Sequence, residues 1–138
     1  MRMTRLRLPA SIESLESFRS FVLHEMDCLD GFEELVPKVE LALEEVLVNV
    51  ISYAYPEGEG EIEIECLAES PESLRITVKD WGGPFNPLDH AGPDLTADIS
   101  SRKVGGLGVY LVKHMADRLA YEYRDGANVL TVWFLKKP

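Results

Sequence analysis

Hydrophobic and polar residues alternate in distinct rhythms along the chain, and each rhythm predicts an element. Polar and apolar residues alternate one by one over residues 3–8, which predicts a short strand that ends at Pro9. From Ser11 onward the apolar residues recur at steps of three and four, the spacing of an amphipathic helix that Ser11 could cap. Its apolar positions are Ile12, Leu15, Phe18, Val22 and Met26.

A second helix is expected after the break at Asp30-Gly31. It begins near Val36, with Pro37 in its first turn, and runs to about Tyr55. Apolar residues occupy most of its circumference, which indicates a largely buried helix. The Pro- and Gly-rich residues 56–60 then predict a turn.

Two alternating runs, Glu61–Leu67 and Ser73–Asp80, predict an antiparallel hairpin. Residues 81–104 follow with little periodicity, and a connection of that length is typical of a lid or binding loop. Helical spacing returns at Leu107–Arg118.

A final hairpin is expected around Asp125-Gly126, from Leu119–Tyr123 and Asn128–Leu135. The predicted order is strand, two helices, two strands, lid, helix and two strands. This order favours one α/β domain, residues 1–138, with helices on one face of a mostly antiparallel sheet and a lid at about 84–104.

Composition excludes several classes of protein. The 138 residues include 14 Lys and Arg against 24 Asp and Glu, a formal net charge of −10 that is wrong for a general nucleic-acid binder. The two cysteines cannot form a disulfide framework, and no apolar run reaches the roughly 18 residues of a membrane span. We therefore expect a cytoplasmic protein that binds neither nucleic acid directly nor a membrane.

The charge is concentrated in one part of the chain. Residues 25–72 hold 15 acids and one base, whereas residues 99–138 hold seven bases and three acids. Glutamates alternate at positions 57, 59, 61, 63 and 65 and so fall on one strand face, which favours a solvated face over a metal site. The Glu-rich surface of residues 57–65 could also be a docking face for a basic partner protein.

Glu45 and Asn49 interrupt the apolar second helix. They are four residues apart and therefore share one face. One interpretation is an ordinary solvent stripe. The other is a pocket wall that supplies an acid–base group and an amide oxygen for a metal.

Asp80 ends a strand whose inward face carries Leu74, Ile76 and Val78. The carboxylate can accept hydrogen bonds from a ligand there, or it can simply initiate a turn. Farther on, Arg102-Lys103 precedes a glycine-rich turn that opens a helix. Such a turn can attract phosphate, or the glycines can simply form a plain turn. This segment matches neither a P-loop nor a dinucleotide fingerprint.

Taken together, these stretches resemble a known family. Their order is that of the histidine-kinase-like ATPase (Bergerat) fold: Glu45-Val-Leu-Val-Asn49 with Tyr53-Ala-Tyr55 after it, then Asp80-Trp-Gly-Gly-Pro-Phe-Asn-Pro87, then Gly105-Gly-Leu-Gly-Val-Tyr-Leu-Val112. Asp117 and Asn128-Val-Leu-Thr131 complete the set. The chain is similar in particular to the stand-alone branch of this fold, the anti-sigma-factor serine/threonine protein kinases of bacterial partner-switching systems. The resemblance covers about Val36 to Lys136 and implies an α+β two-layer sandwich with three helices on one face.

The resemblance also implies roles for individual residues. Asn49 would coordinate the Mg²⁺ that bridges the ATP phosphates, and Glu45 would act as general base. Asp80 would accept from the exocyclic amine of adenine, with Gly82 allowing close backbone approach. Thr131 would support the adenine end through Asp80 or a water.

The phosphate end follows from the same resemblance. The turn of Gly105, Gly106, Leu107 and Gly108 would present N–H groups to the phosphates. Arg102 or Lys103 would reach the γ-phosphate, an assignment that depends on position and charge.

The expected function is that of an ATP- and Mg²⁺-dependent serine/threonine kinase that acts as an anti-sigma factor. Its implied substrate is an anti-sigma-factor antagonist of the STAS type, and a sigma factor and a second copy of the chain are further implied partners. Two alternatives stay open: an ATP-dependent binding switch with little phosphotransfer, and a catalytic domain that works with a histidine kinase.

Overall fold

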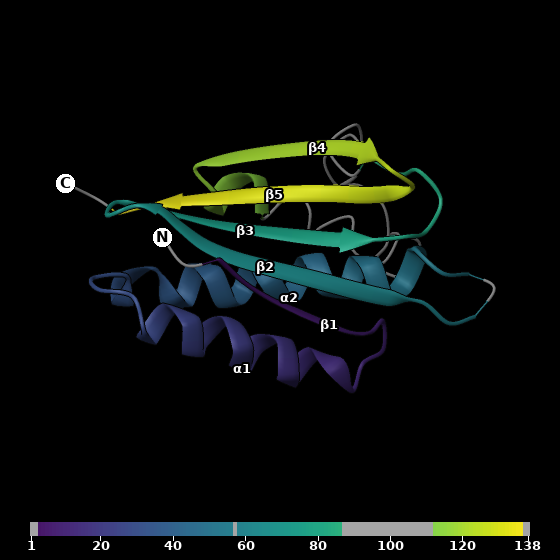
Figure 1. The fold of residues 1–138 in the computed structure, drawn as a ribbon, viewed down its shortest axis with the longest axis horizontal. Helices are drawn as coiled ribbons and strands as arrows, with labels where there is room; N and C mark the ends of the chain where they lie inside the picture. Colours follow the sequence, from purple (N-terminus) through teal and green to yellow (C-terminus); the bar gives the residue numbers. More distant parts are fainter. Residues whose placement is uncertain (1–2, 57, 87–111, 137–138) are drawn as a thin grey trace, which may run out of the picture.

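One antiparallel sheet organises the molecule. The computed structural model describes residues 3–56, 58–86 and 112–136. Within these ranges the sheet has the order β1-β2-β3-β5-β4, and every neighbouring pair is antiparallel (Figure 1). Its strands are β1 (Met3–Pro9), β2 (Glu61–Ser70), β3 (Ser73–Asp80), β4 (Arg118–Arg124) and β5 (Ala127–Leu135).

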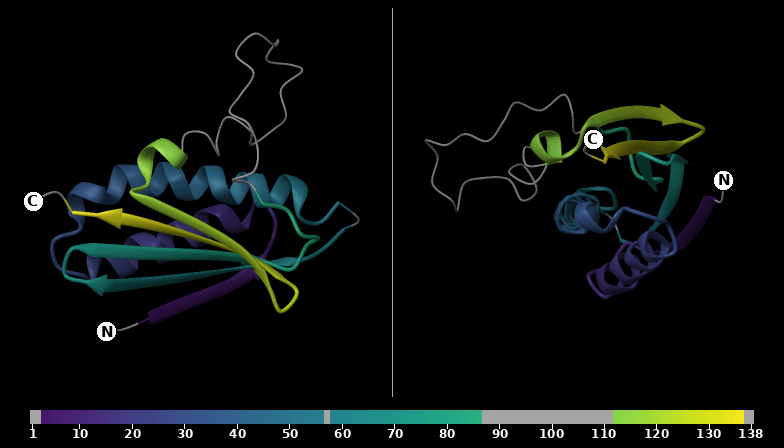
Figure 2. Two further views of the ribbon diagram at one scale, coloured as in Figure 1. Left: turned by 90° about the horizontal axis from the view of Figure 1, so that it is seen from above. Right: turned by 90° about the vertical axis from the view of Figure 1, so that its left-hand side faces the viewer.

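Helices pack on one face of this sheet, as Figure 2 shows. They are α1 (Ser14–Asp27), α2 (Val36–Tyr53) with the short 3-10 helix Glu33–Leu35 before it, and the helical residues 112–115. The predicted two-layer arrangement is therefore confirmed. No helix in the described part of the chain is long and apolar enough to cross a membrane.

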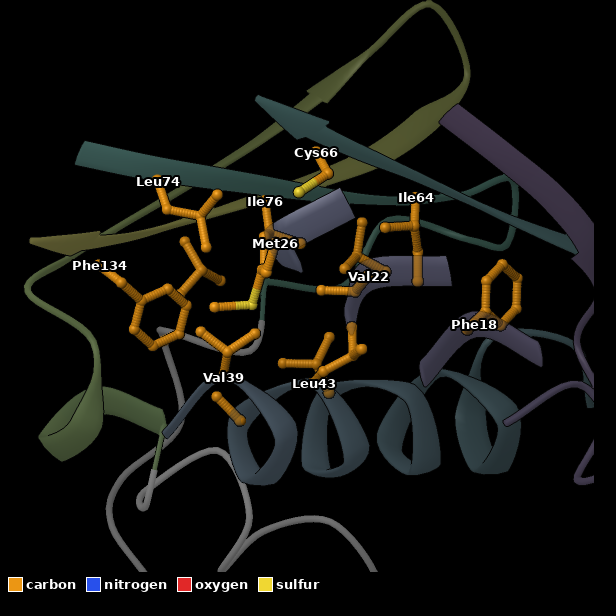
Figure 3. Packing of buried hydrophobic residues seen from close by; sticks show 14 of the residues in the cluster. Phe18, Val22, Met26, Val39, Leu43, Ile64, Cys66, Leu74, Ile76 and Phe134 are labelled. Atoms are coloured by element: carbon orange, nitrogen blue, oxygen red, sulfur yellow. The ribbon is translucent and has the colours of Figure 1, made fainter. Parts of the chain in front are cut away.

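The core lies between the two layers (Figure 3). Strand alternation directs Ile64 and Ile76 toward the helices, where they meet Val22 of α1 and Leu43 of α2. These side chains are at most 5% exposed, so the layers are joined by apolar contact. The packing holds α2 in place against the sheet and so sets the position of the residues on its other faces.

Two helix boundaries differ from the prediction. Helix α1 begins at Ser14, its N-cap position is Glu13, and no side chain caps it, so the expected cap by Ser11 does not form. The backbone carbonyl of Ser11 accepts from the Ser14 N–H at 3.0 Å instead. The third helix ends at residue 115 because Arg118 already pairs with Trp133 in the sheet. Its predicted start at Leu107 lies outside the described residues.

The outer face of the sheet carries paired charges. Glu65 lies 3.4 Å from Arg5 and 3.4 Å from Lys79, and Arg7 lies 3.0 Å from Glu61. Glu63 is also within 4.0 Å of Arg7. Glu61, Glu63 and Glu65 are therefore paired with cations of the same chain, which removes the charge argument for a docking face along β2. Glu57 lies outside the described residues.

Candidate functional site

A pocket lies between the C-terminal half of α2 and the helix-facing side of β3, β5 and β4. Its walls are mostly apolar, with a few polar groups among them, as is usual for small-molecule sites. Asn49 and Asp80, both singled out from the sequence, line this pocket together. Its other lining residues are Val46, Val50, Tyr53, Ala54, Val78, Gly83, Phe85, Val112, Leu119, Tyr121, Asn128 and Leu130.

Asp80 is the buried charge of the pocket, at 7% exposure. One oxygen, Oδ1, accepts from the Gly82 N–H at 3.0 Å and from Nδ2 of Asn128 at 2.9 Å. Burial raises the pKa of the Asp80 carboxyl, and these two hydrogen bonds act in the opposite direction. The expected inward face of Leu74, Ile76, Val78 and Asp80 is thus confirmed.

Asn128 holds the residues that follow Asp80, a role that the sequence patterns did not indicate. Besides Asp80, its Nδ2 donates to the Gly83 carbonyl at 2.9 Å. Its Oδ1 accepts from the Phe85 N–H at 3.0 Å and from the Tyr121 hydroxyl. The cross-strand register reveals this role, because Asn128 lies directly opposite Asp80 in the pairing of β5 with β3.

Thr131 does not occupy the place that the resemblance implied. It pairs with Thr77 and Ala120, three positions along β5 from Asn128. Because a strand alternates its faces with period two, Thr131 lies on the outer side of the sheet, away from Asp80. The expectation for Thr131 is therefore wrong, and Asn128 is the residue of β5 that contacts Asp80.

Asn49 and Glu45 share one half-buried face of α2. Asn49 reaches the pocket, in agreement with the pocket interpretation of this face. Glu45 lies one helical turn earlier and is not among the pocket-lining residues of the described chain. Its carboxylate therefore lies outside the described pocket lining, on the same helix face as the Asn49 amide.

Gly82 is required by packing against α2. A Cβ atom at this position would lie 2.2 Å from the Ala54 carbonyl oxygen, closer than atoms can approach. The close approach at Gly82 is to a protein segment, the end of α2, and the approach of a ligand that the resemblance implies stays a prediction. At Gly83 a Cβ would meet nothing within 4 Å, so packing requires a glycine at position 82 but not at position 83.

The predicted phosphate end lies outside the described residues. This applies to Arg102, Lys103, Gly105, Gly106, Leu107 and Gly108 and to most of the expected lid. Among the described residues, no group of three or more His, Cys, Asp or Glu side chains could hold a metal.

Known proteins resemble this chain in sequence and in fold. The model of the histidine kinase-like ATPase domain matches residues 8–134. Serine/threonine-protein kinase BtrW of Bordetella bronchiseptica is 28% identical over 92 residues, 67% of this chain and 65% of that protein. Serine-protein kinase RsbW of Listeria monocytogenes is 28% identical over 138 residues, 96% of this chain and 87% of that protein.

A solved structure supports the fold. The RsbU and RsbW domains of a Mycobacterium tuberculosis protein match all of this chain and 34% of that chain, with a TM-score of 0.69 and 13% identity. At this identity the likeness concerns the arrangement of helices and strands. The chain thus spans 65% of the Bordetella kinase and about a third of the mycobacterial chain.

Proposed function

The chain belongs to the histidine kinase-like ATPase domain family, and we propose that it is a cytoplasmic serine/threonine protein kinase. The proposed activity is transfer of the γ-phosphate of ATP to an anti-sigma-factor antagonist protein. Two curated relatives carry the names serine/threonine-protein kinase and serine-protein kinase, which supports the reaction class. The whole of residues 1–138 would form this one domain.

The observation that carries the proposal is the oriented carboxylate of Asp80. Its Oδ1 is occupied by Gly82 and Asn128, while the group still lines the pocket. A carboxylate held in this way accepts a hydrogen bond from an exocyclic amine and repels a carbonyl oxygen. Adenine presents the amine at this position and guanine the carbonyl, so the site favours ATP.

The pocket also suits the flat faces of a base. Val46 and Val50 of α2 lie on one side, and Val78 and Leu130 of the sheet lie on the other side of the two-layer sandwich. Apolar walls with a few polar groups are what binds and orients a purine. Asn49 on α2 would then be directed to the phosphate end of the nucleotide.

The described residues fit Mg²⁺ that arrives with the nucleotide. Mg²⁺ prefers oxygen ligands and is commonly held by one or two protein groups together with substrate phosphates. Asn49 supplies an amide oxygen, and we assign it as the protein ligand. When bound, the metal would neutralise charge on the phosphates.

Glu45 is proposed as the general base. It is half-buried on the Asn49 face, one turn along α2. A carboxylate there can accept the proton of a serine hydroxyl as that oxygen attacks the γ-phosphate. Residues 102–108 would bind the phosphates from the opposite side, in keeping with the positive charge of residues 99–138.

A phosphotransfer assay tests the function. The chain is incubated with ATP, Mg²⁺ and a STAS-type antagonist protein, and phosphoserine or phosphothreonine is measured by mass spectrometry. We expect phosphorylation that Glu45→Ala reduces at least about 100-fold, the usual size of a general-base contribution. A matched control, Glu44→Ala on the exposed side of α2, should leave the rate unchanged.

Two results would redirect the proposal. Tight ATP binding with partner capture but no phosphorylated product would favour a binding switch. Phosphorylation that is insensitive to Glu45→Ala would remove that residue from the reaction. Co-purification with the antagonist, with a sigma factor or as a homodimer would identify which of the implied partners this chain uses.

A further inference from the structure

Tyr55 lies just after α2 and joins three separate segments. Its hydroxyl donates to the Glu61 carbonyl at 2.6 Å and accepts from the Trp81 N–H at 2.7 Å. Glu61 is the first residue of β2, and Trp81 directly follows Asp80. One side-chain oxygen therefore bridges the ends of two neighbouring strands.

The bridge stands where the next pair of the ladder would form. Strands β2 and β3 pair in a register that joins Glu63 with Lys79 and Ile62 with Asp80. One further step would pair Glu61 with Trp81. The Tyr55 hydroxyl satisfies both backbone groups in place of a direct bond, so the strands separate immediately after Asp80.

Packing holds the tyrosine in this position. A Cβ at Gly60 would lie 2.1 Å from the Tyr55 ring, so the ring lies directly on the backbone before β2. On the other side, the Gly82 backbone lies against the Ala54 carbonyl. The last residues of the α2 segment thus contact both the start of β2 and the turn that follows Asp80.

We propose that Tyr55 is a positioning residue for the base of the nucleotide. By separating β2 from β3 at Trp81, its hydroxyl directs the Asp80 carboxylate toward the pocket and the Gly82 backbone against the Ala54 carbonyl at the end of α2. It also ties this base-binding end to α2, which carries Asn49 and Glu45. The inference rests on the proposed ATP binding and assigns a residue that determines base selectivity.

Removal of the hydroxyl has a defined consequence. In Tyr55→Phe the Trp81 N–H and Glu61 carbonyl lose their shared partner, and they can then approach each other or take up water. Either change moves the residue next to Asp80 and so alters the direction of the carboxylate. Asn49 is unaffected, because α2 is held by its own core contacts.

The experiment compares ATP and GTP binding by calorimetry in the wild-type chain and in Tyr55→Phe. We expect the Kd for ATP to rise about 3- to 10-fold, the equivalent of one hydrogen bond, while GTP binding changes less. Gly60→Ala should reproduce the effect, because its methyl group displaces the ring without removing the hydroxyl. Both variants should therefore lower the ATP-to-GTP affinity ratio.

A control separates positioning from stability. Trp133→Phe removes a 3.2 Å hydrogen bond to Glu69 on the outer sheet face, outside the pocket lining. It should lower the melting temperature and leave the ATP-to-GTP ratio unchanged. Hydrogen exchange at the Trp81 amide, measured without nucleotide, should be faster in Tyr55→Phe than in the wild type.

The outcomes are distinguishable. A wild-type chain that binds no ATP would overturn the proposed function, and with it this role of Tyr55. Wild-type binding with an unchanged ATP-to-GTP ratio in both variants would overturn the positioning role alone. The positioning role is also overturned if Trp133→Phe lowers the ratio as much as Tyr55→Phe does.

Discussion

At Asp80, burial and hydrogen bonding act in opposite directions on one carboxyl group. Desolvation raises its pKa, while Asn128 and Gly82 stabilise the charged form. The net shift is upward from 3.8, so burial has the larger effect. The ionised carboxylate therefore lowers the free energy of unfolding, as is expected if Asp80 serves the proposed binding site rather than the fold.

The raised pKa of Asp80 makes the free energy of unfolding depend on pH. Just above pH 3.8 the folded chain holds a proton at Asp80 that the unfolded chain has lost. The contribution of Asp80 to the free energy of unfolding therefore falls as pH rises from 3.8 through the raised folded value. ATP binding runs the other way, since the ionised carboxylate is the better acceptor.

Asp80→Asn should separate binding from stability. The amide oxygen can keep the bonds from Gly82 and Asn128, so at pH 7 we expect stability equal to or above that of the wild type. The Kd for ATP should rise about 10- to 100-fold through loss of a charge-assisted hydrogen bond. Urea denaturation between pH 4 and 7, with calorimetry at pH 7, measures both effects.

One combination of results would contradict the prediction for Asp80→Asn. If Asp80→Asn is less stable than the wild type at pH 7 and binds ATP equally well, the carboxylate serves the fold. The wild type should also lose stability relative to the variant as pH rises through the window above 3.8.

Single-residue predictions succeeded where one strand or helix decides the answer. Alternation placed Asp80 inward, and helical spacing placed Asn49 beside Glu45. Asn128 was missed because its role depends on which residue of β3 lies opposite, and one strand alone does not define register. The same limit explains the wrong expectation for Thr131. Alternation puts Thr131 and Asn128 on opposite faces of β5, but only the register with β3 shows which of the two lies beside Asp80.

At the scale of elements, the end of α2 and the turn after β3 form one packed unit. Gly82 approaches the Ala54 carbonyl, and Asn128 holds the same turn through the Gly83 carbonyl. The element types were predictable because their apolar periods are clear. Boundaries such as the end of the third helix were not, since strand pairing at Arg118 overrides helical spacing.

A pair of glycine variants tests this unit. Gly82→Ala forces a methyl group against a backbone oxygen that cannot move freely, so we expect a loss of about 1–3 kcal/mol in the free energy of unfolding. Gly83→Ala meets open space and should change stability by less than about 0.5 kcal/mol. Chemical denaturation of both variants gives the comparison, and equal losses would contradict the packing argument.

At the scale of the whole molecule, part of the strong negative charge is paired with cations on the outer face of the sheet. The side chains of Glu63 and Glu65 are only 12% exposed and lie among Arg5, Arg7 and Lys79 on the outer sheet face. The sequence alone shows these glutamates as an acidic strand face, because the cations beside them come from other strands. A basic partner would therefore find little excess charge at this face.

Glu65→Gln tests whether this network serves the fold or a partner. Glu65 has two cations at 3.4 Å, so we expect a loss of about 0.5–1 kcal/mol in the free energy of unfolding that shrinks in 1 M NaCl. Glu122→Gln breaks a pair with Arg124 in which both side chains are 56% exposed, and it should change stability by less than about 0.3 kcal/mol. The KM for the protein substrate should be unchanged in both variants. A rise in that KM for Glu65→Gln alone, without loss of stability, would show instead that the paired glutamates take part in docking.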